Sequence, residues 1–456
     1  MKRTLAVFAA CCGGRLEGAD ATFAGVVIDS RRVGNGDLFA ALPGTRTDGH
    51  EFIAAAAAAG AAGAIVSRPV GTAVPKIVVA DVAQALSAAG SAWRAEFRGP
   101  LLAVAGSNGK TTTKEMLAAI LALRGECLAT RGNLNNQLGV PLTLLRLREI
   151  HRSAVIELGA NRAGEVAELT ALARPDIGLI TNAGAEHLEG FGDLDGVARA
   201  EGELVAGLSA EGVAIINADD PYAPLWRGMT RARILSFGFQ PGADVRASEL
   251  RLDAGAEGFI TRFTLHAYGG AVPVALALAG RHNVYNALAA AAAAQAAGAT
   301  LAQLATGLGS VRAVEGRLQF KPAAQGAWLI DDSYNANPSS ARAALEVLAE
   351  LPGRRWLVLG DMAELGAHAE ASHRELGTLA RECGVERLYS YGALAALAAD
   401  SFGAGAERHD DIDALVRSVG GALQAEVRLL VKGSRVNRLE RVVAALTGAG
   451  PARRVV

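Results

Sequence analysis

The chain has 456 residues, enough for about three domains of ordinary size, each with its own core. Its 45 basic and 46 acidic residues leave a formal net charge of −1, which gives no overall electrostatic reason to bind nucleic acid or an anionic membrane. Its four cysteines lack the spacing of a zinc site or a disulfide framework and favour a reducing, cytoplasmic compartment; they are Cys11, Cys12, Cys127 and Cys383. Small molecules are therefore the expected partners.

Two apolar stretches resemble export or membrane signals. A basic pair precedes the run 4–12, as in a short signal peptide, but apolar residues at helical spacing before Gly13 and Gly14 favour a first amphipathic helix. The uncharged stretch 283–311 is long enough to span a bilayer, yet it is mostly alanine interrupted by polar residues. We expect packed helices there and no stable membrane insertion.

Short apolar runs predict strands between helical segments, and turn signals divide them into three α/β units. A turn at 97–100 and the segment near 314 predict domains over residues 1–98, 99–314 and 315–456. In the second unit the strands end in polar residues, as at the carboxyl edge of a doubly wound parallel sheet. Expected strands lie at 25–28, 64–66 and 76–79, then at 154–157, 177–181 and 213–217, and then at 328–330, 356–359, 387–389 and 429–431.

One segment of the second unit carries the strongest chemical signal. An apolar run at 101–105 leads into the residues GSNGKT and a polar helix start. The glycines allow successive backbone N–H groups to face one anion, Lys110 adds a positive charge, and Thr111 offers a hydroxyl to Mg²⁺. Val104 stands where the general phosphate-loop motif has its first glycine, so the spacing is G-x-x-G-K-T. We predict a nucleoside triphosphate site rather than an ordinary glycine-rich turn.

Two further polar residues follow strands of the same unit. Glu157 closes the run 154–157 and His187 lies beyond the run 177–181, so both are expected near the phosphate loop. A carboxylate is a common ligand of Mg²⁺, and an imidazole is a weaker one. Single residues of these types are more often solvated or satisfied inside a core, so accompanying motifs decide their interpretation.

Motifs spread over the whole chain resemble the Mur ligases. They are GSNGKTTTKE at 106–115, GNLNNQLGVP at 132–141, IELGA at 156–160, HLEGFG at 187–192, GRHN at 280–283, DSYNANP at 332–338, LGDMAELG at 359–366 and VKGSR at 431–435. Within this family, the runs at 332–338 and 359–366 favour the branch that adds a D-alanyl-D-alanine dipeptide.

The resemblance implies an ATP-dependent amide ligase of the α/β class, with a central P-loop-type doubly wound parallel sheet, a smaller N-terminal α/β domain for a UDP-sugar and a C-terminal Rossmann-like domain. A substrate carboxylate would attack the γ-phosphate of ATP, and the amine of D-Ala-D-Ala would displace phosphate from the acyl phosphate. The implied partners are UDP-N-acetylmuramoyl-tripeptide (UDP-MurNAc-tripeptide), D-Ala-D-Ala, ATP and Mg²⁺, in peptidoglycan precursor synthesis. A monomer is expected, and the third peptide residue, meso-diaminopimelate or lysine, stays open.

The resemblance also implies roles for individual residues. The implied catalytic residues are Lys110, Glu157, His187, Glu201 and Arg317. The implied Mg²⁺ ligands are Thr111, Glu157, His187 and Glu201. The implied nucleotide contacts are Gly106, Ser107, Asn108, Gly109, Lys110, Thr111, Thr112, Asn283 at the adenine, Arg317 at the γ-phosphate, Asp332 at the ribose or between domains, Tyr334 and Asn335. The implied substrate contacts are Ser30, Arg31, Thr45, Asp48, Gly49 and His50 at the UDP-sugar, Asn135 and Asn136 in the substrate channel unless they only stabilise turns, and Asn337 on the closing C-terminal face.

Glu201 departs from the family pattern, which usually has at this position a lysine that reacts with CO₂ to form an anionic carbamate ligand of Mg²⁺. Glu201 is already an anion. We expect it to replace the carbamate, directly or through a water because its side chain is shorter. In the alternative, Glu201 points to solvent and a second metal is weakly held.

Three other functions stay open. Two are enzymes: a sister amino-acid-adding ligase, or an enzyme like folylpolyglutamate synthase with the same central domain. A first domain that anchors UDP argues against the latter. The third is a nucleotide-responsive binding protein without catalysis, for which the missing lysine at Glu201 is the one sequence hint.

Overall fold

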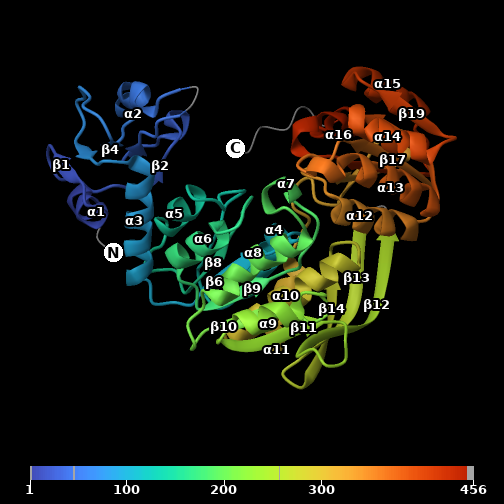
Figure 1. Cartoon of the computed structure of the whole chain (residues 1–456), viewed down its shortest axis with the longest axis horizontal. Coiled ribbons are helices and arrows are strands. Elements are labelled where there is room, and N and C mark those ends of the chain that lie inside the picture. Colours follow the sequence, from blue (N-terminus) through green and yellow to red (C-terminus); the bar gives the residue numbers. More distant parts are fainter. Residues whose placement is uncertain (1–2, 45–46, 256, 449–456) are drawn as a thin grey trace.

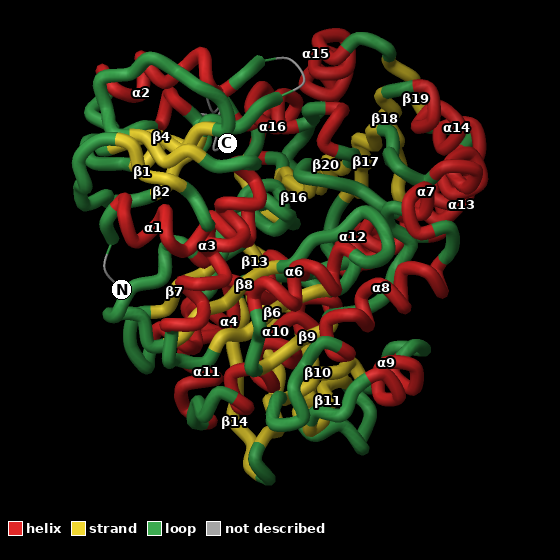
Figure 2. Tube along the Cα trace, turned by 60° about the vertical axis from the view of Figure 1, so that its left-hand side comes forward, coloured by secondary structure: helices red, strands yellow, loops and turns green. Residues whose placement is uncertain are grey.

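The structure, a computed structural model, describes residues 3–44, 47–255 and 257–448 of the chain. In these residues the strands form sheets of five, nine and six strands, and helices pack on each sheet. Figure 1 shows the three units in sequence order, from the blue N-terminal unit through the green and yellow central unit to the red C-terminal unit. In the view of Figure 2 the two terminal units both lie above the central one. The predicted α/β class is confirmed.

The N-terminal sheet is parallel except at one edge. Its strand order is β1-β5-β4-β3-β2, with β1 antiparallel to β5. The predicted first helix is confirmed: α1 ends at Cys12, and Gly13 caps it with a φ of +65°, which suits glycine. β1 and β3 were not predicted, because three residues are too few to show a period. The bounds are α1 (Leu5–Cys12), β1 (Arg15–Glu17), β2 (Val26–Val27), η1 (Ser30–Arg32), β3 (Leu38–Ala40), η2 (Gly49–Phe52), α2 (Ile53–Ala58), β4 (Gly63–Val66), β5 (Lys76–Val78) and α3 (Val82–Glu96).

The central sheet has the order β14-β13-β12-β11-β10-β9-β6-β8-β7. The strands from β7 to β12 are parallel to their neighbours, as predicted for a doubly wound sheet, whereas β13 and β14 add an antiparallel extension. The strands are β6 (Leu101–Ala105), β7 (Cys127–Ala129), β8 (Ser153–Glu157), β9 (Ile177–Ile180), β10 (Val213–Asn217), β11 (Arg233–Gly238), β12 (Val245–Gly255), β13 (Gly258–Ala267) and β14 (Gly270–Leu276). The helices are α4 (Lys110–Ala122), α5 (Gly139–Leu144), α6 (Glu165–Ala173), α7 (Leu188–Phe191), α8 (Leu194–Ala206), α9 (Ala223–Met229), α10 (Arg281–Ala296) and α11 (Leu301–Ser310).

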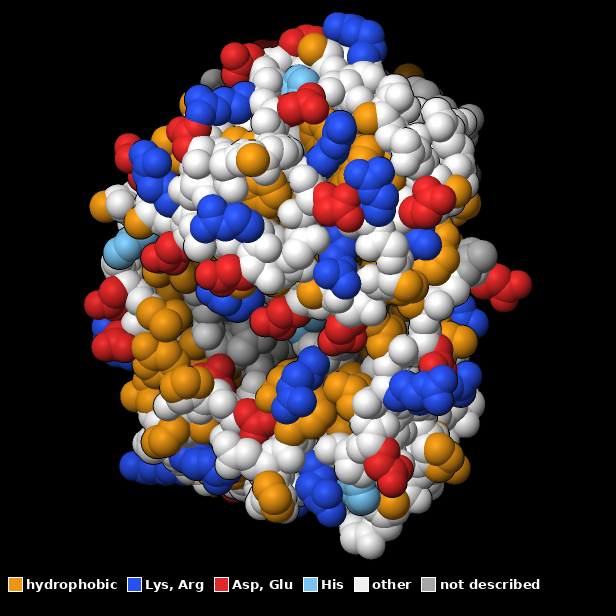
Figure 3. Space-filling view, turned by 90° about the vertical axis from the view of Figure 1, so that its right-hand side faces the viewer, with side chains coloured by type: hydrophobic (Ala, Val, Ile, Leu, Met, Phe, Trp, Pro, Cys, Tyr) orange, Lys and Arg blue, Asp and Glu red, His pale blue; other side chains and the backbone are white. Residues whose placement is uncertain are grey.

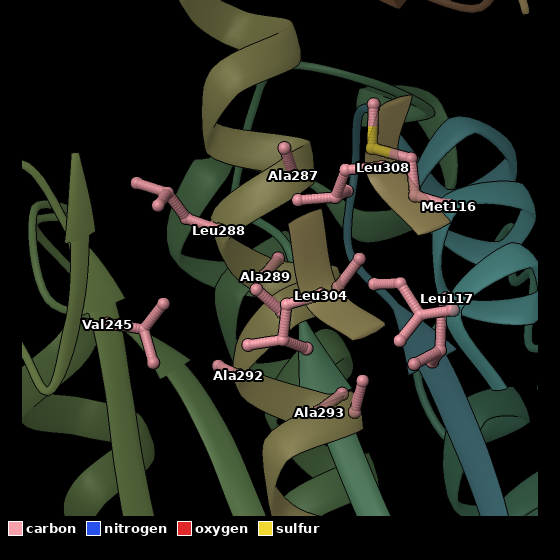
Figure 4. Packing of buried hydrophobic residues seen from close by; sticks show 14 of the residues in the cluster. Met116, Leu117, Val245, Ala287, Leu288, Ala289, Ala292, Ala293, Leu304 and Leu308 are labelled. Carbon is pink, nitrogen blue, oxygen red and sulfur yellow. The ribbon is translucent and has the colours of Figure 1, made fainter. Parts of the chain in front are cut away.

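Helices cover both faces of this sheet because its central strands are apolar on both sides. In β6, Leu102 and Val104 pack with α4, α10 and α11, whereas Leu101 and Ala103 pack on the other face with α5 and α6. Figure 4 shows Met116 of α4 near the alanines of α10 and the leucines of α11. The alanines at 289–294 are all buried, so the predicted close-packed helices at 283–311 are confirmed.

The antiparallel extension reaches the C-terminal unit. β12 and β13 pair with each other, and Phe259 of β13 packs in the core of the C-terminal unit. The rings of Phe259 and Phe320 meet edge to face with centroids 5.7 Å apart. Figure 1 shows these two long strands extending from the central sheet to the neighbourhood of α12. This contact ties the central unit to the C-terminal unit at a distance from the phosphate loop.

The C-terminal sheet has the order β15-β16-β20-β17-β18-β19, parallel except for the edge strand β15. α12, α13 and α14 pack on one face and α15 and α16 on the other, which is the predicted Rossmann-like arrangement. The bounds are β15 (Gln319–Pro322), η3 (Ala324–Gly326), β16 (Trp328–Asp332), α12 (Pro338–Glu350), β17 (Arg354–Gly360), η4 (Gly366–His368), α13 (Ala369–Glu382), β18 (Val385–Tyr391), α14 (Ala393–Phe402), β19 (Ala406–His409), α15 (Ile412–Ala422), β20 (Val427–Lys432), η5 (Arg435–Asn437) and α16 (Glu440–Thr447).

The predicted domain boundaries fall in connecting segments. Residue 98 lies between α3 and β6, and residue 314 lies between α11 and β15. The boundaries themselves stay predictions. Within the described part of the chain, no helix combines the length and the apolar character needed to cross a bilayer.

Candidate active site

The phosphate loop connects the end of β6 to the start of α4. Gly106 (φ +118°) and Gly109 (φ +83°) adopt backbone conformations that other residues rarely take. A Cβ on Gly106 would lie 2.8 Å from the backbone nitrogen of Thr181, which follows β9. The Thr181 hydroxyl donates to the carbonyl oxygen of Asn108 at 2.7 Å, and Ser107 of the loop is buried. The loop is therefore packed tightly against the carboxyl edge of the sheet.

Lys110 is the first residue of α4, and its ammonium is surrounded by hydrogen-bond acceptors. Its Nζ donates to the carbonyl oxygen of Gly106, to that of Ser107 at 3.0 Å and to Oε1 of Glu186 at 3.2 Å. Burial acts to lower the pKa of Lys110, but the carboxylates nearby, Glu186 first and then Glu201, outweigh it and raise that pKa. The lysine therefore carries its charge in the absence of nucleotide.

Glu186 was missed by the sequence analysis. It follows Thr181 by five residues and precedes His187, and its side chain is only 13% exposed. Burial raises the pKa of Glu186 to about 7, and the charge of Glu201 adds to this rise while Lys110 opposes it. The sequence marks Glu186 as a site residue only by its position just beyond a predicted strand. The same position marks its neighbour His187, which was the residue predicted.

Glu201 lies on α8 and points inward. The residue is 3% exposed, and its Oε2 accepts a hydrogen bond from the backbone N–H of Gly106 at 2.6 Å. Burial raises the pKa of Glu201, and Lys110 opposes that rise. The alternative in which Glu201 points to solvent is therefore wrong, because the carboxylate is tied to the first glycine of the phosphate loop.

Glu157 ends β8, as predicted, and is 2% exposed. Its Oε1 accepts a hydrogen bond from Nδ2 of Asn135 at 2.8 Å, while its Oε2 is buried with no hydrogen-bond partner among the described residues. A buried carboxylate oxygen without a donor is costly, and a cation would satisfy it. No cluster of three or more His, Cys, Asp or Glu side chains suited to a metal occurs in the described residues, so oxygens of the nucleotide would have to complete such a site.

Arg317 reaches the phosphate loop from the C-terminal unit. One guanidinium nitrogen, Nη2, donates to the hydroxyl of Thr111 at 3.2 Å, and the guanidinium carbon lies 4.3 Å from the ring centroid of Tyr334. The Nε of Arg317 is buried without a hydrogen-bond partner among the described residues. Thr111 and Thr112 both lie in the first turn of α4. The arginine is thus held beside the loop with a donor still unused.

A second contact joins the same two units. Asn337, the N-cap of α12, donates from Nδ2 to Oδ1 of Asn108 at 2.9 Å, and Asn108 donates to the hydroxyl of Ser339 at 3.0 Å. Asn337 and Asn108 were both predicted as site residues, one in each unit, and the structure brings them into contact. Ser339 was not predicted. Figure 3 shows a hollowed face between the upper and lower parts of the molecule, with charged side chains of both signs at its rim.

His187 also contacts the C-terminal unit. Its Nδ1 lies 2.8 Å from Oε2 of Glu364, and its backbone is left-handed with φ +47°. A cavity of about 250 Å³ lies beside this pair and is also lined by Asn161, Glu189 and Gly190. The structure thus pairs His187 with a carboxylate of the other unit, and its role as a metal ligand stays a prediction.

Three predicted nucleotide contacts are engaged in local hydrogen bonds. Asn283 on α10 donates to the carbonyl oxygen of Ala279 at 2.8 Å. Asp332 accepts from Nζ of Lys432 at 2.6 Å and from the backbone N–H of Leu318 at 3.1 Å. Both partners of Asp332 lie within the predicted C-terminal domain, so its hydrogen bonds do not support an interdomain contact. The backbone oxygen of Asn335 also accepts from Lys432, at 3.0 Å.

The predicted UDP-sugar residues gather at two 3₁₀ turns of the N-terminal unit. Ser30 and Arg31 lie in η1, where Arg31 pairs with Asp29 at 2.7 Å. Asp48 caps η2, which starts at Gly49, and its Oδ1 lies 2.7 Å from Nδ1 of His50. The hydrogen bond from the backbone N–H of His50 is the main cause that lowers the pKa of Asp48. Thr45 lies outside the described residues.

Arg68 and Ser67 contact the residues of this second turn, and neither was predicted. Arg68 pairs with Oδ2 of Asp48 at 2.9 Å, and the backbone N–H of Ser67 donates to Nε2 of His50 at 3.0 Å. His50 is buried, with both ring nitrogens used inside the unit. Asn136 likewise has a local function: its Oδ1 accepts from the backbone N–H of Gly139 at 2.9 Å, at the start of α5.

Comparison with known proteins covers nearly the whole chain. Sequence models of the Mur ligase family match residues 22–124 (Mur ligase family, catalytic domain), 104–294 (Mur ligase middle domain) and 316–435 (Mur ligase, glutamate ligase domain). The UDP-N-acetylmuramoyl-tripeptide–D-alanyl-D-alanine ligase of Escherichia coli is 43% identical over 98% of this chain and 99% of its own.

Solved structures show the same likeness. The crystal structure of MurF from Acinetobacter baumannii superposes with a TM-score of 0.90 at 36% identity, over 98% of this chain and 99% of that one. MurF ligase from Thermotoga maritima in complex with ADP gives a TM-score of 0.81 at 27% identity, over 93% and 97% of the two chains. With this similarity in sequence and structure along almost its entire length, the chain belongs to the Mur ligase family.

Proposed function

We propose that this chain joins D-Ala-D-Ala to UDP-MurNAc-tripeptide at the expense of ATP, which completes the pentapeptide of the peptidoglycan precursor. The observation that carries the proposal is the meeting of the phosphate loop with Arg317 and Asn337 of the C-terminal unit. These contacts place the phosphate loop, where a carboxylate would be phosphorylated, next to the face of the C-terminal unit that would close over it. The full-length similarity to the E. coli ligase of that name supports the substrate assignment.

The reaction has two steps. A carboxylate oxygen of the tripeptide attacks the γ-phosphorus of ATP, the bond to the bridging oxygen breaks, and ADP leaves. The amine of D-Ala-D-Ala then attacks the carbonyl carbon of the acyl phosphate, an amide bond forms, and inorganic phosphate leaves with the former carboxylate oxygen. The amine loses a proton in this step. A carboxylate alone is a poor acceptor for an amine, so the first step supplies the leaving group that the second requires.

The phosphate loop supplies positive charge for the first step. In this proposal the ammonium of Lys110, once released from its present acceptors, would face the position where negative charge spreads over the transferring group, with the guanidinium of Arg317 and the backbone N–H groups at the start of α4. Thr111 and Glu157 would hold Mg²⁺, which neutralises phosphate charge when bound; the unpartnered Oε2 of Glu157 fits that role. Glu201 would serve as a further anionic ligand in place of a carbamate, and His187 as another ligand of the metal.

The C-terminal unit closes the site. Asn337 and Ser339 contact Asn108 of the loop, and Arg317 contacts Thr111, so the closed arrangement brings polar groups of both units around the phosphates. Closure would exclude water, which otherwise hydrolyses an acyl phosphate before the amine arrives. In this proposal Tyr334 orients Arg317, and Asn283, Asp332 and Asn335 lie on the nucleoside side.

The N-terminal unit would bind the UDP end of the substrate. Ser30 and Arg31 carry side-chain donors that would form hydrogen bonds with a diphosphate, whereas the backbone N–H groups of His50 and Glu51 already donate to Asp48. Asp48 and His50 would shape that turn, since they bond to each other and to neighbouring residues of the unit. Asn135, bonded to Glu157, would lie along the path of the peptide toward the phosphates. We further propose a monomer that works in the cytoplasm.

The test is product formation with a panel of acceptors and amines. Purified protein, ATP and Mg²⁺ are mixed with UDP-MurNAc-tripeptide that carries meso-diaminopimelate or lysine, and mass spectrometry detects the pentapeptide. We expect product with D-Ala-D-Ala and one of the two tripeptides. Product with single amino acids on a shorter peptide would indicate a sister ligase. Nucleotide binding without any product would indicate a binding protein.

A further inference from the structure

The ammonium of Lys110 has no donor left for a phosphate. A lysine has three N–H donors, and those of Lys110 meet two loop carbonyl oxygens, of Gly106 and Ser107, and the carboxylate of Glu186. A second loop donor is occupied as well, because the backbone N–H of Gly106 donates to Glu201. Carboxylates of the protein itself therefore satisfy two groups of the kind that would hold a nucleotide phosphate.

The two carboxylates differ in how firmly they are held. Glu201 is 3% exposed on the 13-residue helix α8 and is bonded to backbone. Glu186 lies in the segment between β9 and α7, outside any helix or strand, and Lys110 is the one side chain bonded to its carboxylate among the described residues. Of the three acceptors on Lys110, two belong to the backbone of the loop, so Glu186 is the one that can leave without unfolding the loop.

We infer that Glu186 is an internal competitor for the nucleotide: it holds Lys110 in the free protein, and the terminal phosphates must displace it to reach the lysine. This inference rests on the proposed ATP site. The like charge of a carboxylate at 3.2 Å from the lysine opposes an incoming triphosphate, and the ion pair to be broken is mostly buried. Glu186 thereby sets the nucleotide affinity below what the same loop would reach without it.

The competition should depend on which phosphates a nucleotide carries. A phosphate-loop lysine reaches the β- and γ-phosphates, so a nucleoside monophosphate does not compete for Lys110. Changing Glu186 to Gln keeps the size of the side chain and removes the charge that binds the ammonium. The variant should bind nucleoside triphosphate more tightly and bind AMP with unchanged affinity.

Calorimetric titration tests this on the full chain with a non-hydrolysable ATP analogue, ADP and AMP, each with and without Mg²⁺. For E186Q we expect about tenfold tighter binding of the ATP analogue, the effect of weakening one charge-assisted hydrogen bond, and no change for AMP. E189Q is the matched control, because it removes the same charge from an exposed position three residues away. E186A should reproduce the gain if E186Q folds poorly.

Each other outcome overturns the inference in a recognisable way. If the unchanged protein binds no ATP analogue, the proposed ATP site fails and the competitor fails with it. If the unchanged protein binds the ATP analogue and E186Q binds it equally well or more weakly, only the inference that Glu186 competes with the nucleotide is wrong. Weaker binding by E186Q that occurs only in buffer containing Mg²⁺ would instead make Glu186 a metal ligand. An equal gain for AMP would also contradict competition at Lys110.

Discussion

Asn337 of the C-terminal unit donates a hydrogen bond from Nδ2 to Oδ1 of Asn108 in the phosphate loop, at 2.9 Å and across 229 positions of sequence. The same side chain caps α12 by accepting from the backbone N–H of Ser340 at 2.8 Å. One residue therefore fixes the start of a helix and the closure of the site. These two functions can be separated by substitution.

The substitutions Asn337→Asp and Asn337→Ala separate them. Aspartate keeps the oxygen that caps α12 but cannot donate to Asn108, so we expect kcat to fall about tenfold with little change in thermal stability. Alanine removes both bonds and should also destabilise the protein by about 1 kcal/mol. Steady-state kinetics and thermal melting of both variants check this. An unchanged kcat in Asn337→Asp would show that this contact has no part in closure.

Glu157 is predicted to bind Mg²⁺ through its unpartnered oxygen. The substitution Glu157→Gln keeps an acceptor for Asn135 but removes the charge, so the Mg²⁺ concentration at half-maximal activity should rise by about tenfold or more. Titration of activity with Mg²⁺ measures this. The exposed Glu168 on α6 gives the control Glu168→Gln, which should leave the titration unchanged. Equal curves for Glu157→Gln and the unchanged protein would remove Glu157 from the metal site.

Glu201 is predicted to make the enzyme independent of CO₂. Activity should be the same in buffer depleted of bicarbonate, and Glu201→Gln should lose most activity. Glu201→Lys restores the residue usual in the family and should make activity rise on addition of bicarbonate. Circular dichroism of both variants checks the fold, because the carboxylate also accepts a hydrogen bond from the loop at 2.6 Å. A fully active Glu201→Gln would contradict the role.

His373 should make the C-terminal unit sensitive to acid. It is fully buried; its Nε2 accepts from the backbone N–H of Met362 at 2.9 Å, and its Nδ1 donates to the carbonyl oxygen of Ala369 at 2.6 Å. This neutral arrangement has no place for a second ring proton. Burial lowers the pKa of His373, so below about pH 6.5 the unfolded chain binds a proton that the folded chain does not.

The free energy of unfolding should therefore fall as the pH drops below about 6.5, by at most about 1.4 kcal/mol per pH unit from this residue. Denaturant unfolding at pH 7.5 and pH 5.5 measures the difference. The difference should shrink in His373→Gln and persist in His368→Gln, which removes an exposed histidine nearby. An equal difference in both variants would assign the acid sensitivity to other groups.

The parts of the site that are contiguous in sequence were predictable. Gly106, Gly109 and Lys110 form a compact loop because two glycines and a lysine at that spacing between a strand and a helix leave few other structures. Glu157 was predictable because polar residues that end parallel strands meet at one edge of the sheet. Those two regularities are local, so one sequence is enough to reveal them.

The rest depends on contacts between distant residues. Glu186 meets Lys110 across 76 positions and Ser339 meets Asn108 across 231, and no local pattern marks either partner. The antiparallel strands β13 and β14 were also missed, and part of the burial of β13 comes from another unit, since Phe259 packs in the C-terminal core. Asn136, in contrast, was predicted as a substrate contact, but in the structure its amide oxygen accepts a hydrogen bond at the start of α5.

The most direct test follows one oxygen atom. UDP-MurNAc-tripeptide labelled with ¹⁸O in its terminal carboxylate is converted with ATP, Mg²⁺ and D-Ala-D-Ala, and the released phosphate is analysed by mass spectrometry. If the phosphate loop serves to phosphorylate that carboxylate, the phosphate carries one ¹⁸O for each amide bond formed. Unlabelled phosphate together with amide formation would contradict the account.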